Sequence, residues 1–309
     1  MLRIPEDTVK VTPPLLTLED VSRQFPGFLL DRVSFRLEPG YVMGLIGPNG
    51  AGKTTLIKLM LNLLRPSAGT ITIFGLDHRR HEVEVKKQLG YVGERAHYPP
   101  EATAEWVGRF MAQWFPTWDD ALYRSYLNRF AVPPRGVVRT LSKGQVTKLA
   151  LAAAMGHRPR LLILDEPTSG LDPLVRREVV GALREVVRDE GRSVLFSTHI
   201  LSDLESLADY ITVLAGGHLI TSESMDTLAD RWKRLTYTCT PGPRPQGSSS
   251  VITGDFGPDL VNNIGLATPS TGPVEVASLS LEEILAQLVH AGSAPPESGR
   301  EQGGRVERQ

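Results

Sequence analysis

The chain has 309 residues, of which 41% are hydrophobic, and a formal net charge of −1. This composition can bury a sizeable core and predicts one large domain or two smaller ones. The near-neutral charge argues against nucleic-acid binding, which usually needs a surplus of Lys and Arg. The single Cys239 excludes an internal disulfide framework and a cysteine-rich zinc site, as is typical of proteins from a reducing compartment.

Membrane-spanning and targeting segments are not predicted. No stretch reaches the roughly 20 uninterrupted apolar residues that cross a bilayer. The N-terminal residues Met1 to Asp7 have no signal-peptide core. If the function involves a membrane, we expect another chain to cross it.

The first elements in chain order are strands. Strands are predicted at residues 15–21, 33–37 and 41–46, and the last is an apolar run that leads directly into a glycine-rich turn. A helix is predicted from Thr54 to Leu64, and Arg65, Pro66 and the residues up to Gly69 end it. The local order is therefore strand, loop, helix.

The middle of the chain changes from helical to alternating patterns. Helical spacing with interspersed aromatic residues runs from Thr103 to Phe130 and predicts a small helical insert. After it come predicted strands at 161–164, 193–197 and 210–214, separated by helices that begin at Pro173 and near Leu201. Such alternation predicts a parallel sheet with flanking helices.

A small appendage is predicted after Trp232. Residues 241–250 have the composition of a linker, and residues 292–309 that of a disordered tail. Between these segments, residues 279–289 predict an amphipathic helix, with Ser280 as its N-cap and Glu283 three residues later completing a capping box.

The glycine-rich turn has the pattern of a phosphate-binding loop. Its glycines allow backbone conformations in which successive N–H groups turn toward phosphate oxygens, and the following helix points its positive end at the same anion. Lys53 would bind the β- and γ-phosphates and the Thr54 hydroxyl a Mg²⁺ ion. The alternative is a glycine-rich turn with an incidental Lys-Thr. The predicted ATP-binding residues are Gly47, Pro48, Asn49, Gly50, Ala51, Gly52, Lys53, Thr54 and Thr55.

Two acidic residues end the apolar strand at 161–164. Asp165 and Glu166 should project from the carboxyl edge of the sheet, where open α/β folds bind ligands. One carboxylate would hold Mg²⁺, and the next would act as general base toward the attacking water. The alternative is a pair of acids that caps the next helix or solvates the end of the strand.

These motifs, with three more in the same order, resemble the ATP-binding subunit of ATP-binding-cassette (ABC) transporters over about Leu15 to Asp230. The LSGGQ signature of the family corresponds to Leu141, Ser142, Lys143, Gly144 and Gln145. The loop that joins the two ATP sites corresponds to Ser169, Gly170, Leu171 and Asp172, and the switch-histidine segment to Ser197, Thr198 and His199.

The resemblance implies an α/β P-loop NTPase fold with a RecA-like core, an antiparallel β subdomain and a helical subdomain. The implied parts are an N-terminal extension (1–14), the ATPase domain (15–232, with the helical subdomain at about 95–157), an α+β appendage (233–291) and a tail (292–309). ATP and Mg²⁺ are the implied cofactors.

The resemblance also implies roles for single residues. Phe25 would stack on adenine, although it could be only an apolar residue near a strand end. His199 would contact the γ-phosphate and position the Glu166 base. Asp172 would organise the dimer interface, and it could also cap a helix. Metal ligands would be Thr54, Asp165 and Glu94.

Two residues depart from the family pattern. Lys143 replaces the first signature glycine and adds a cation close to the expected position of the partner's nucleotide. Glu94 occupies the position of the Q-loop glutamine, and its carboxylate can bind Mg²⁺ but cannot donate as an amide does. Together they resemble the ATPases of the ABC-2-type exporter group of multidrug and bacitracin-resistance systems. Glu94 and the segment from Tyr98 to Trp106 are expected to dock the membrane subunit.

The leading hypothesis is a cytoplasmic Mg²⁺-dependent ATPase, peripheral on the inner face of the membrane. It would form a homodimer or heterodimer on two ATP molecules and drive a permease on a separate chain, in the direction of export, with no nucleic-acid partner. One alternative is a soluble ABC ATPase of translation or DNA repair, which the short span from Glu94 to Leu141 opposes. Another alternative is a nucleotide-binding regulator that does not hydrolyse ATP. The replacement of the Q-loop glutamine by Glu94 leaves this alternative open.

Overall fold

The computed structural model describes residues 13–188, 192–238, 249–255 and 274–293. The chain divides into two compact units, the first made of Met1–Val42 and Thr54–Phe196 and the second of Met43–Lys53 and Ser197–Gln309. Within the described ranges, no helix combines the length and the apolar character needed to cross a membrane.

The first unit contains an antiparallel block of strands in the order β5-β4-β1-β2. β1 and β2 form a hairpin with Phe25 opposite Phe28, and Gly27 supplies the positive φ (+79°) that the tight turn needs. The predicted first two strands are confirmed, and both extend toward this turn. The bounds are β1 (Leu16–Phe25), β2 (Phe28–Leu37), β4 (Ala68–Ile73) and β5 (Leu76–Asp77).

A second run of strands in this unit has the order β8-β7-β6. β6 and β7 are parallel, with Leu89 opposite Leu161, in agreement with the alternation of strand and helix in the sequence. Every residue of β7 is buried, because the strand lies in the interior of the sheet. The bounds are β6 (Leu89–Val92), β7 (Leu161–Asp165) and β8 (Ser193–Thr198), with α1 (Lys53–Met60) and α2 (Glu82–Lys86) earlier in the chain.

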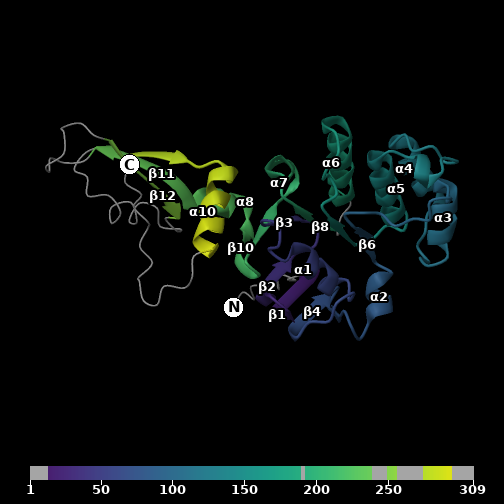
Figure 1. The fold of residues 1–309 in the computed structure, drawn as a ribbon, viewed down its shortest axis with the longest axis horizontal. Helices are drawn as coiled ribbons and strands as arrows, with labels where there is room; N and C mark the ends of the chain where they lie inside the picture. Colours follow the sequence, from purple (N-terminus) through teal and green to yellow (C-terminus); the bar gives the residue numbers. More distant parts are fainter. Residues whose placement is uncertain (1–12, 189–191, 239–248, 256–273, 294–309) are drawn as a thin grey trace, which may run out of the picture. The chain divides into compact units, whose positions relative to one another are not determined.

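The predicted helical insert forms a group of helices in which α4 packs on α5 and α3 packs on both (Figure 1). Thr103 caps α3 by accepting a hydrogen bond from the Trp106 amide, and Asp119 caps α4 in the same way through the Leu122 amide. The bounds are α3 (Ala104–Ala112), α4 (Asp120–Arg129), the short 3₁₀ helix η1 (Val138–Thr140) and α5 (Lys143–Met155).

The long helix α6 (Pro173–Arg188) is joined to this helical group by ion pairs. Lys148 of α5 pairs with Glu178, and Arg129 of α4 pairs with Glu185. Lys148 is almost buried, so its ammonium depends on this carboxylate more than a surface lysine would.

The second unit contains strands in the order β10-β9-β3, with β3 parallel to β9. α7 packs closely here, since a β-carbon on Gly44 of β3 would lie 2.1 Å from Leu204. Gly216 and Gly217, both with positive φ, make the turn between β9 and β10. The bounds are β3 (Val42–Ile46), α7 (Leu201–Leu207), β9 (Tyr210–Ala215), β10 (His218–Ser224) and α8 (Met225–Arg231).

The appendage forms a separate sheet in the order β12-β11-β13, followed by α10, which packs on β9, β10 and α7. The predicted capping box of α10 is confirmed, because Ser280 and Glu283 exchange hydrogen bonds. The linker prediction is wrong at its end, where Ser249 already begins β12, and the tail prediction is wrong at Gly292, which still belongs to α10. The remaining residues of both segments lie outside the described residues. The bounds are β11 (Trp232–Thr238), β12 (Ser249–Asp255), β13 (Val274–Ser278) and α10 (Leu281–Ser293).

A buried histidine links the helical group to β6. His157 is 1% exposed, its Nε2 lies 3.3 Å from the Leu89 carbonyl oxygen, and its ring stacks on Phe115. Its Nδ1 has no hydrogen-bond partner in the part of the chain that the structure describes. Burial lowers the pKa of His157 from 6.5 to about 4, since a charged ring here would lose its hydration.

This depressed pKa predicts a loss of stability in acid. The unfolded chain binds a proton near pH 6.5 and the folded chain only near pH 4, so the stabilisation is complete above pH 6.5 and is lost as the pH falls toward 4. Between pH 7 and pH 5 the free energy of unfolding should fall by about 2 kcal/mol from His157 alone. Urea denaturation at pH 7 and at pH 5 measures this decrease. In His157→Phe the free energy of unfolding should fall by about 2 kcal/mol less between the two pH values than in the parent chain.

The exposed His97 offers a matched control. His97→Gln should keep the acid sensitivity of the parent chain, because it leaves the buried His157 in place. An equal decrease in the parent chain and in His157→Phe would show that His157 does not titrate as proposed.

Candidate nucleotide site

The loop between β3 and α1 has the backbone of a phosphate cradle. Gly50 (φ +81°) and Gly52 (φ +108°) adopt conformations that side-chain-bearing residues rarely take. Gly47 is constrained in another way, because a β-carbon there would lie 2.2 Å from the carbonyl oxygen of Leu214 on β9. The glycines predicted from the sequence are therefore required by backbone geometry at three positions.

Lys53 is folded back into this loop. Its side chain is buried, and Nζ donates hydrogen bonds to the carbonyl oxygens of Gly47 (2.7 Å) and Pro48 (3.4 Å). The Ala51 amide closes the turn by donating to the Pro48 carbonyl at 3.1 Å. The loop thus holds a cation beside glycine amides, which fits a phosphate group.

The outer surface of the loop is accessible to a ligand. Pro48, Asn49 and Gly50 are exposed, and so is Thr54 in the first turn of α1. Thr55 is half-buried. The hydroxyl of Thr54 therefore lies at the positive end of a helix that is open to solvent.

The two predicted acidic residues end β7 in different environments. Asp165 is 2% exposed, while Glu166 has a left-handed backbone conformation (φ +52°). That conformation costs about 1 kcal/mol or more for a residue with a side chain, and such strain is concentrated at functional sites. The turn is closed by a 3.2 Å hydrogen bond from the Ser169 amide to the Glu166 carbonyl. No sequence pattern indicates this strain.

The charge of Asp165 acts on the neighbouring strand β6. Burial raises the pKa of Tyr91 on that strand, and the Asp165 carboxylate adds to the increase. Among the described residues, no group of three or more His, Cys, Asp or Glu could hold a metal ion by itself. Mg²⁺ usually takes one or two protein ligands and completes its shell with water and substrate phosphates, and Thr54, Asp165 and Glu94 remain its predicted ligands.

The predicted signature segment begins a helix. Ser142 caps α5: its Oγ accepts from the Gln145 amide at 3.2 Å, and the Gln145 side chain accepts from the Ser142 amide at 3.0 Å. The Ser142 hydroxyl proton is not used by this cap. Gly144 lies against α6, because a β-carbon there would be 3.3 Å from Val175. Leu141 is half-buried just before the cap.

The structure brings the signature segment together with the predicted interface loop. Lys143 Nζ donates to the Ser169 carbonyl oxygen at 2.8 Å. At the other end of that loop, Asp172 Oδ1 accepts from the amides of Leu174 and Val175, both at 3.0 Å. The alternative role of Asp172 as a helix cap is therefore confirmed, since these bonds start α6.

His199 directly follows β8. Ser197 and Thr198 are buried, whereas the imidazole of His199 is exposed at the end of the strand. The Thr198 hydroxyl accepts a hydrogen bond from the Ile200 amide at 3.0 Å and so shapes the turn. His199 and the phosphate loop both belong to the second unit, while the acidic residues and the signature belong to the first.

Phe25 and Glu94 lie in the first unit. Phe25 ends β1, is half-buried, and has the Arg23 guanidinium 5.0 Å from its ring centroid. Arg23 is not a site residue predicted from the sequence. The signal that could have found it is its position two residues before Phe25, because residues two apart in a strand lie on the same face. Glu94 is exposed just after β6. In the predicted docking segment, burial raises the pKa of Tyr98 to about 12, and Ala102 and Ala104 are buried as well.

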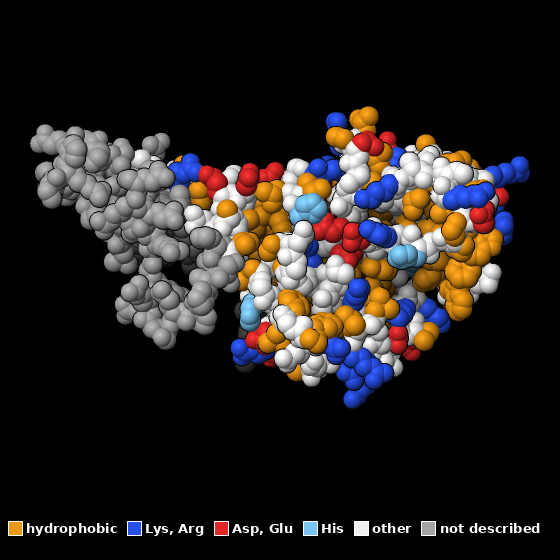
Figure 2. Space-filling view, in the orientation of Figure 1, with side chains coloured by type: hydrophobic (Ala, Val, Ile, Leu, Met, Phe, Trp, Pro, Cys, Tyr) orange, Lys and Arg blue, Asp and Glu red, His pale blue; other side chains and the backbone are white. Residues whose placement is uncertain are grey.

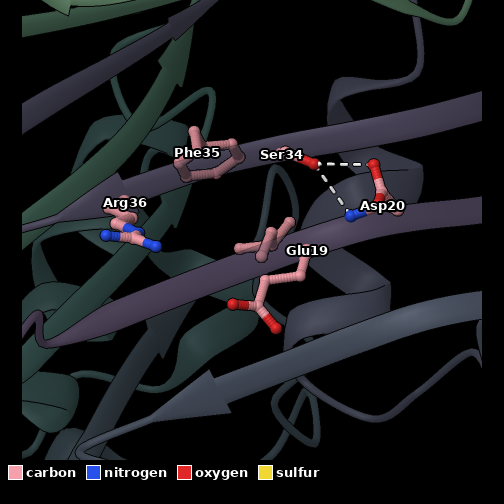
Figure 3. Close-up of a pocket in the computed structure, with 6 residues that line it drawn as sticks. Glu19, Asp20, Ser34, Phe35 and Arg36 are labelled. Atoms are coloured by element: carbon pink, nitrogen blue, oxygen red, sulfur yellow. Dashed lines mark hydrogen bonds between the residues drawn. The ribbon is translucent and has the colours of Figure 1, made fainter.

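A shallow hollow on β1 and β2 lies apart from these residues (Figure 3). The Ser34 hydroxyl accepts from the Asp20 amide at 2.8 Å and donates to the Asp20 carboxylate at 3.2 Å. None of its lining residues is a predicted site residue. The lining residues are Leu18, Glu19, Asp20, Ser34, Phe35 and Arg36.

Known proteins match the chain over the parts that carry this geometry. A family model described as ABC transporter matches residues 30–169. YdbJ of Bacillus subtilis, described as an uncharacterized ABC transporter ATP-binding protein, is 32% identical over 215 residues, which cover 69% of this chain and 70% of YdbJ. This chain is an ABC transporter ATP-binding protein. ABC ATP-binding domains are ATPases, so this chain belongs to a known enzyme family.

Other relatives of this ABC protein have names that refer to transport or resistance. The bacitracin transport ATP-binding protein BcrA of Enterococcus faecalis is 29% identical, with 72% of this chain and 73% of BcrA covered. The daunorubicin resistance ATP-binding protein DrrA3 of Streptomyces coeruleorubidus is 38% identical, with 64% of each chain covered. A solved structure of the ATP binding subunit of an ABC transporter has a TM-score of 0.64 and 29% identity, covering 69% of this chain and 91% of that one.

Proposed function

We propose that this chain hydrolyses ATP in a Mg²⁺-dependent reaction and thereby powers export through a permease on a separate chain. The observation that carries the proposal is the folded-back Lys53, whose ammonium is held 2.7 Å from the Gly47 carbonyl within a loop in which Gly50 and Gly52 have positive φ. Such a loop is ready to exchange these carbonyl contacts for phosphate oxygens.

The proposed reaction is attack of water on the γ-phosphate. A bond forms between the water oxygen and the γ-phosphorus, and the bond to the β–γ bridging oxygen breaks, releasing ADP and phosphate. Glu166 takes the proton of the water, Lys53 binds the β- and γ-phosphates, and His199 donates a hydrogen bond to the γ-phosphate. Bound Mg²⁺ would supply positive charge against the phosphate oxygens.

In this proposal the signature segment does not contact the ATP that is bound by its own chain. We assign Ser142 and Gly144 to the ATP held by a second ABC subunit, so that each chain contributes two half-sites to a dimer. Support comes from the resemblance of the motif and from the position of Ser142 at the positive end of α5, with a hydroxyl proton left to donate.

The docking surface for the permease is assigned to the aromatic stripe, defined as Trp106, Phe110 and Trp114. These side chains are 37%, 41% and 63% exposed, and they lie four residues apart, on one side of α3 and just past its end. Trp106 stacks on Phe110 with ring centroids 5.1 Å apart, and Phe110 meets Trp114 edge-on. Figure 2 shows hydrophobic side chains gathered where α3 lies.

The aromatic stripe extends the docking prediction made from the sequence beyond Trp106. Other aromatic residues of the helical insert, such as Tyr123 and Phe130, are buried and belong to the core. Exposed clusters of aromatic residues are typical of protein interfaces. The names of BcrA and DrrA3 support export as the direction, and we assign this chain to the cytoplasmic side of the membrane, where ATP is available.

Replacing the stripe tests the membrane partner. Phe110→Ser with Trp114→Ser should abolish co-purification of an integral membrane protein from membranes, because the interface loses its largest apolar groups. ATP turnover of the isolated chain should stay within about twofold, since neither residue is assigned to the nucleotide site. Recovery is measured by affinity purification from detergent-solubilised membranes, and turnover by phosphate release with Mg²⁺ and with EDTA.

The control is Leu63→Ser, which removes an exposed leucine that lies outside the stripe. It should leave the partner bound. Recovery of ribosomes or DNA in place of a membrane protein would favour the soluble ABC ATPase, and absence of Mg²⁺-dependent phosphate release would favour the regulator.

A further inference from the structure

Lys143 has a positive charge at a helix end where positive charge is unfavourable. It is the first residue of α5, where the helix end is positive and a cation is disfavoured. Its side chain is exposed, yet Nζ is fixed by the 2.8 Å hydrogen bond to the Ser169 carbonyl. The cation therefore interacts with the interface loop of its own chain.

The contact lies beside the glycine that follows Ser169. Gly170 has a positive φ (+67°), and a β-carbon on it would lie 2.6 Å from Lys143 Nζ. The ammonium group thus occupies the space that a side chain at residue 170 would fill. Lys143 and Gly170 fit each other as a pair.

The loop reached by Lys143 is short and begins at Glu166. The Ser169 amide bonds to the Glu166 carbonyl, and the Leu171 amide bonds to the Thr168 carbonyl, both at 3.2 Å. Asp172 then anchors the loop on α6. Lys143 holds the middle of this loop, and the strained residue at its start is the proposed general base.

We infer that Lys143 is a positioning residue that couples the signature segment to the Glu166 turn within one chain. This inference rests on the proposed function, in which Ser142 and Gly144 contact the partner's ATP and Glu166 serves the ATP of its own chain. Binding of the partner's nucleotide moves the start of α5, and Lys143 transmits that movement to the loop carrying Glu166. The two ATP sites of the dimer are thereby linked.

Three variants separate this role from simple folding. Lys143→Met keeps most of the side-chain length but removes the donor, and Lys143→Arg retains a cationic donor. Arg129→Met is the matched control, since Arg129 is another surface cation of the helical group that contacts α6, through Glu185. All three should unfold at nearly the same temperature, because surface contacts contribute little stability.

The kinetic test is ATP turnover as a function of ATP concentration. Lys143→Met should lower kcat about three- to tenfold, the range expected for the net contribution of one ordinary hydrogen bond, and bring the Hill coefficient toward one. The affinity of a single chain for ATP should stay the same. Lys143→Arg should recover most of kcat and of the cooperativity, and Arg129→Met should behave as the parent chain.

A second measurement needs no turnover. Amide hydrogen exchange of the nucleotide-free chain should become faster in residues 166–172 of Lys143→Met, but not in Lys143→Arg or Arg129→Met. Unchanged exchange in this segment would overturn the inference, as would unchanged kcat and Hill coefficient. A parent chain without ATP turnover would instead contradict the proposed function, and the exchange data would then decide the inference alone.

Discussion

Glu166→Gln should reduce ATP turnover by about 10²- to 10⁴-fold and leave ATP binding intact. The amide has the same shape as the carboxylate, so the left-handed backbone at this residue can be kept. An amide cannot accept the proton of the attacking water, so the bond to the γ-phosphorus forms without a base. Phosphate release measures turnover, equilibrium titration measures binding, and size-exclusion chromatography with ATP should show a stable dimer.

Glu105→Gln is the control, because Glu105 is an exposed acid in the first turn of α3. It should turn over ATP at the parent rate and form no trapped dimer. Hydrolysis at the parent rate in Glu166→Gln would remove Glu166 from the proposed role of base.

Lys53→Met should weaken ATP binding by about 10²-fold or more. The buried ammonium of Lys53 is the full positive charge of the loop, and hydrogen bonds to a charged group contribute about 1.5–3 kcal/mol each. The nucleotide-free chain should unfold at a lower temperature, because the carbonyl oxygen of the buried Gly47 loses its donor. Scanning calorimetry should show that ATP no longer raises that temperature.

Lys58→Met provides the comparison within the same helix. Lys58 is exposed on α1, so its removal should leave both the affinity for ATP and the ATP-induced rise in unfolding temperature. Equal ATP affinity in Lys53→Met and the parent chain would contradict the assignment of the phosphate loop.

The features that can be predicted from the sequence are those that a short segment determines. The turn from β3 into α1 depends on its own glycines, and the capping box of Ser280 and Glu283 depends on residues three apart. Asp165 is predictable at a strand end because the apolar run before it has the length of a buried strand. Such local rules are sufficient for the elements that surround the site.

Other features depend on contacts between distant segments and do not follow from local patterns. The bond between Lys143 and Ser169 joins residues 26 positions apart, whereas the motif alone relates Lys143 only to a partner's nucleotide. The aromatic residues of the helical insert recur at intervals of one to five positions, yet Tyr123 is buried and Trp114 is exposed, because packing of α3, α4 and α5 decides which side faces solvent. The strands of the appendage likewise pair over long sequence separations, with Trp232 opposite Asp255 and Lys233 opposite Ser278.

The close approach of Gly47 to Leu214 gives β9 a part in shaping the phosphate loop. The carbonyl oxygen of Leu214 occupies the space where a side chain at residue 47 would lie, so β9 restricts the conformation of the loop. α10 of the appendage packs on that same strand. A chain shortened before Leu281 therefore lacks the helix that packs on this strand, and we expect its affinity for nucleotide to differ from that of the chain with α10.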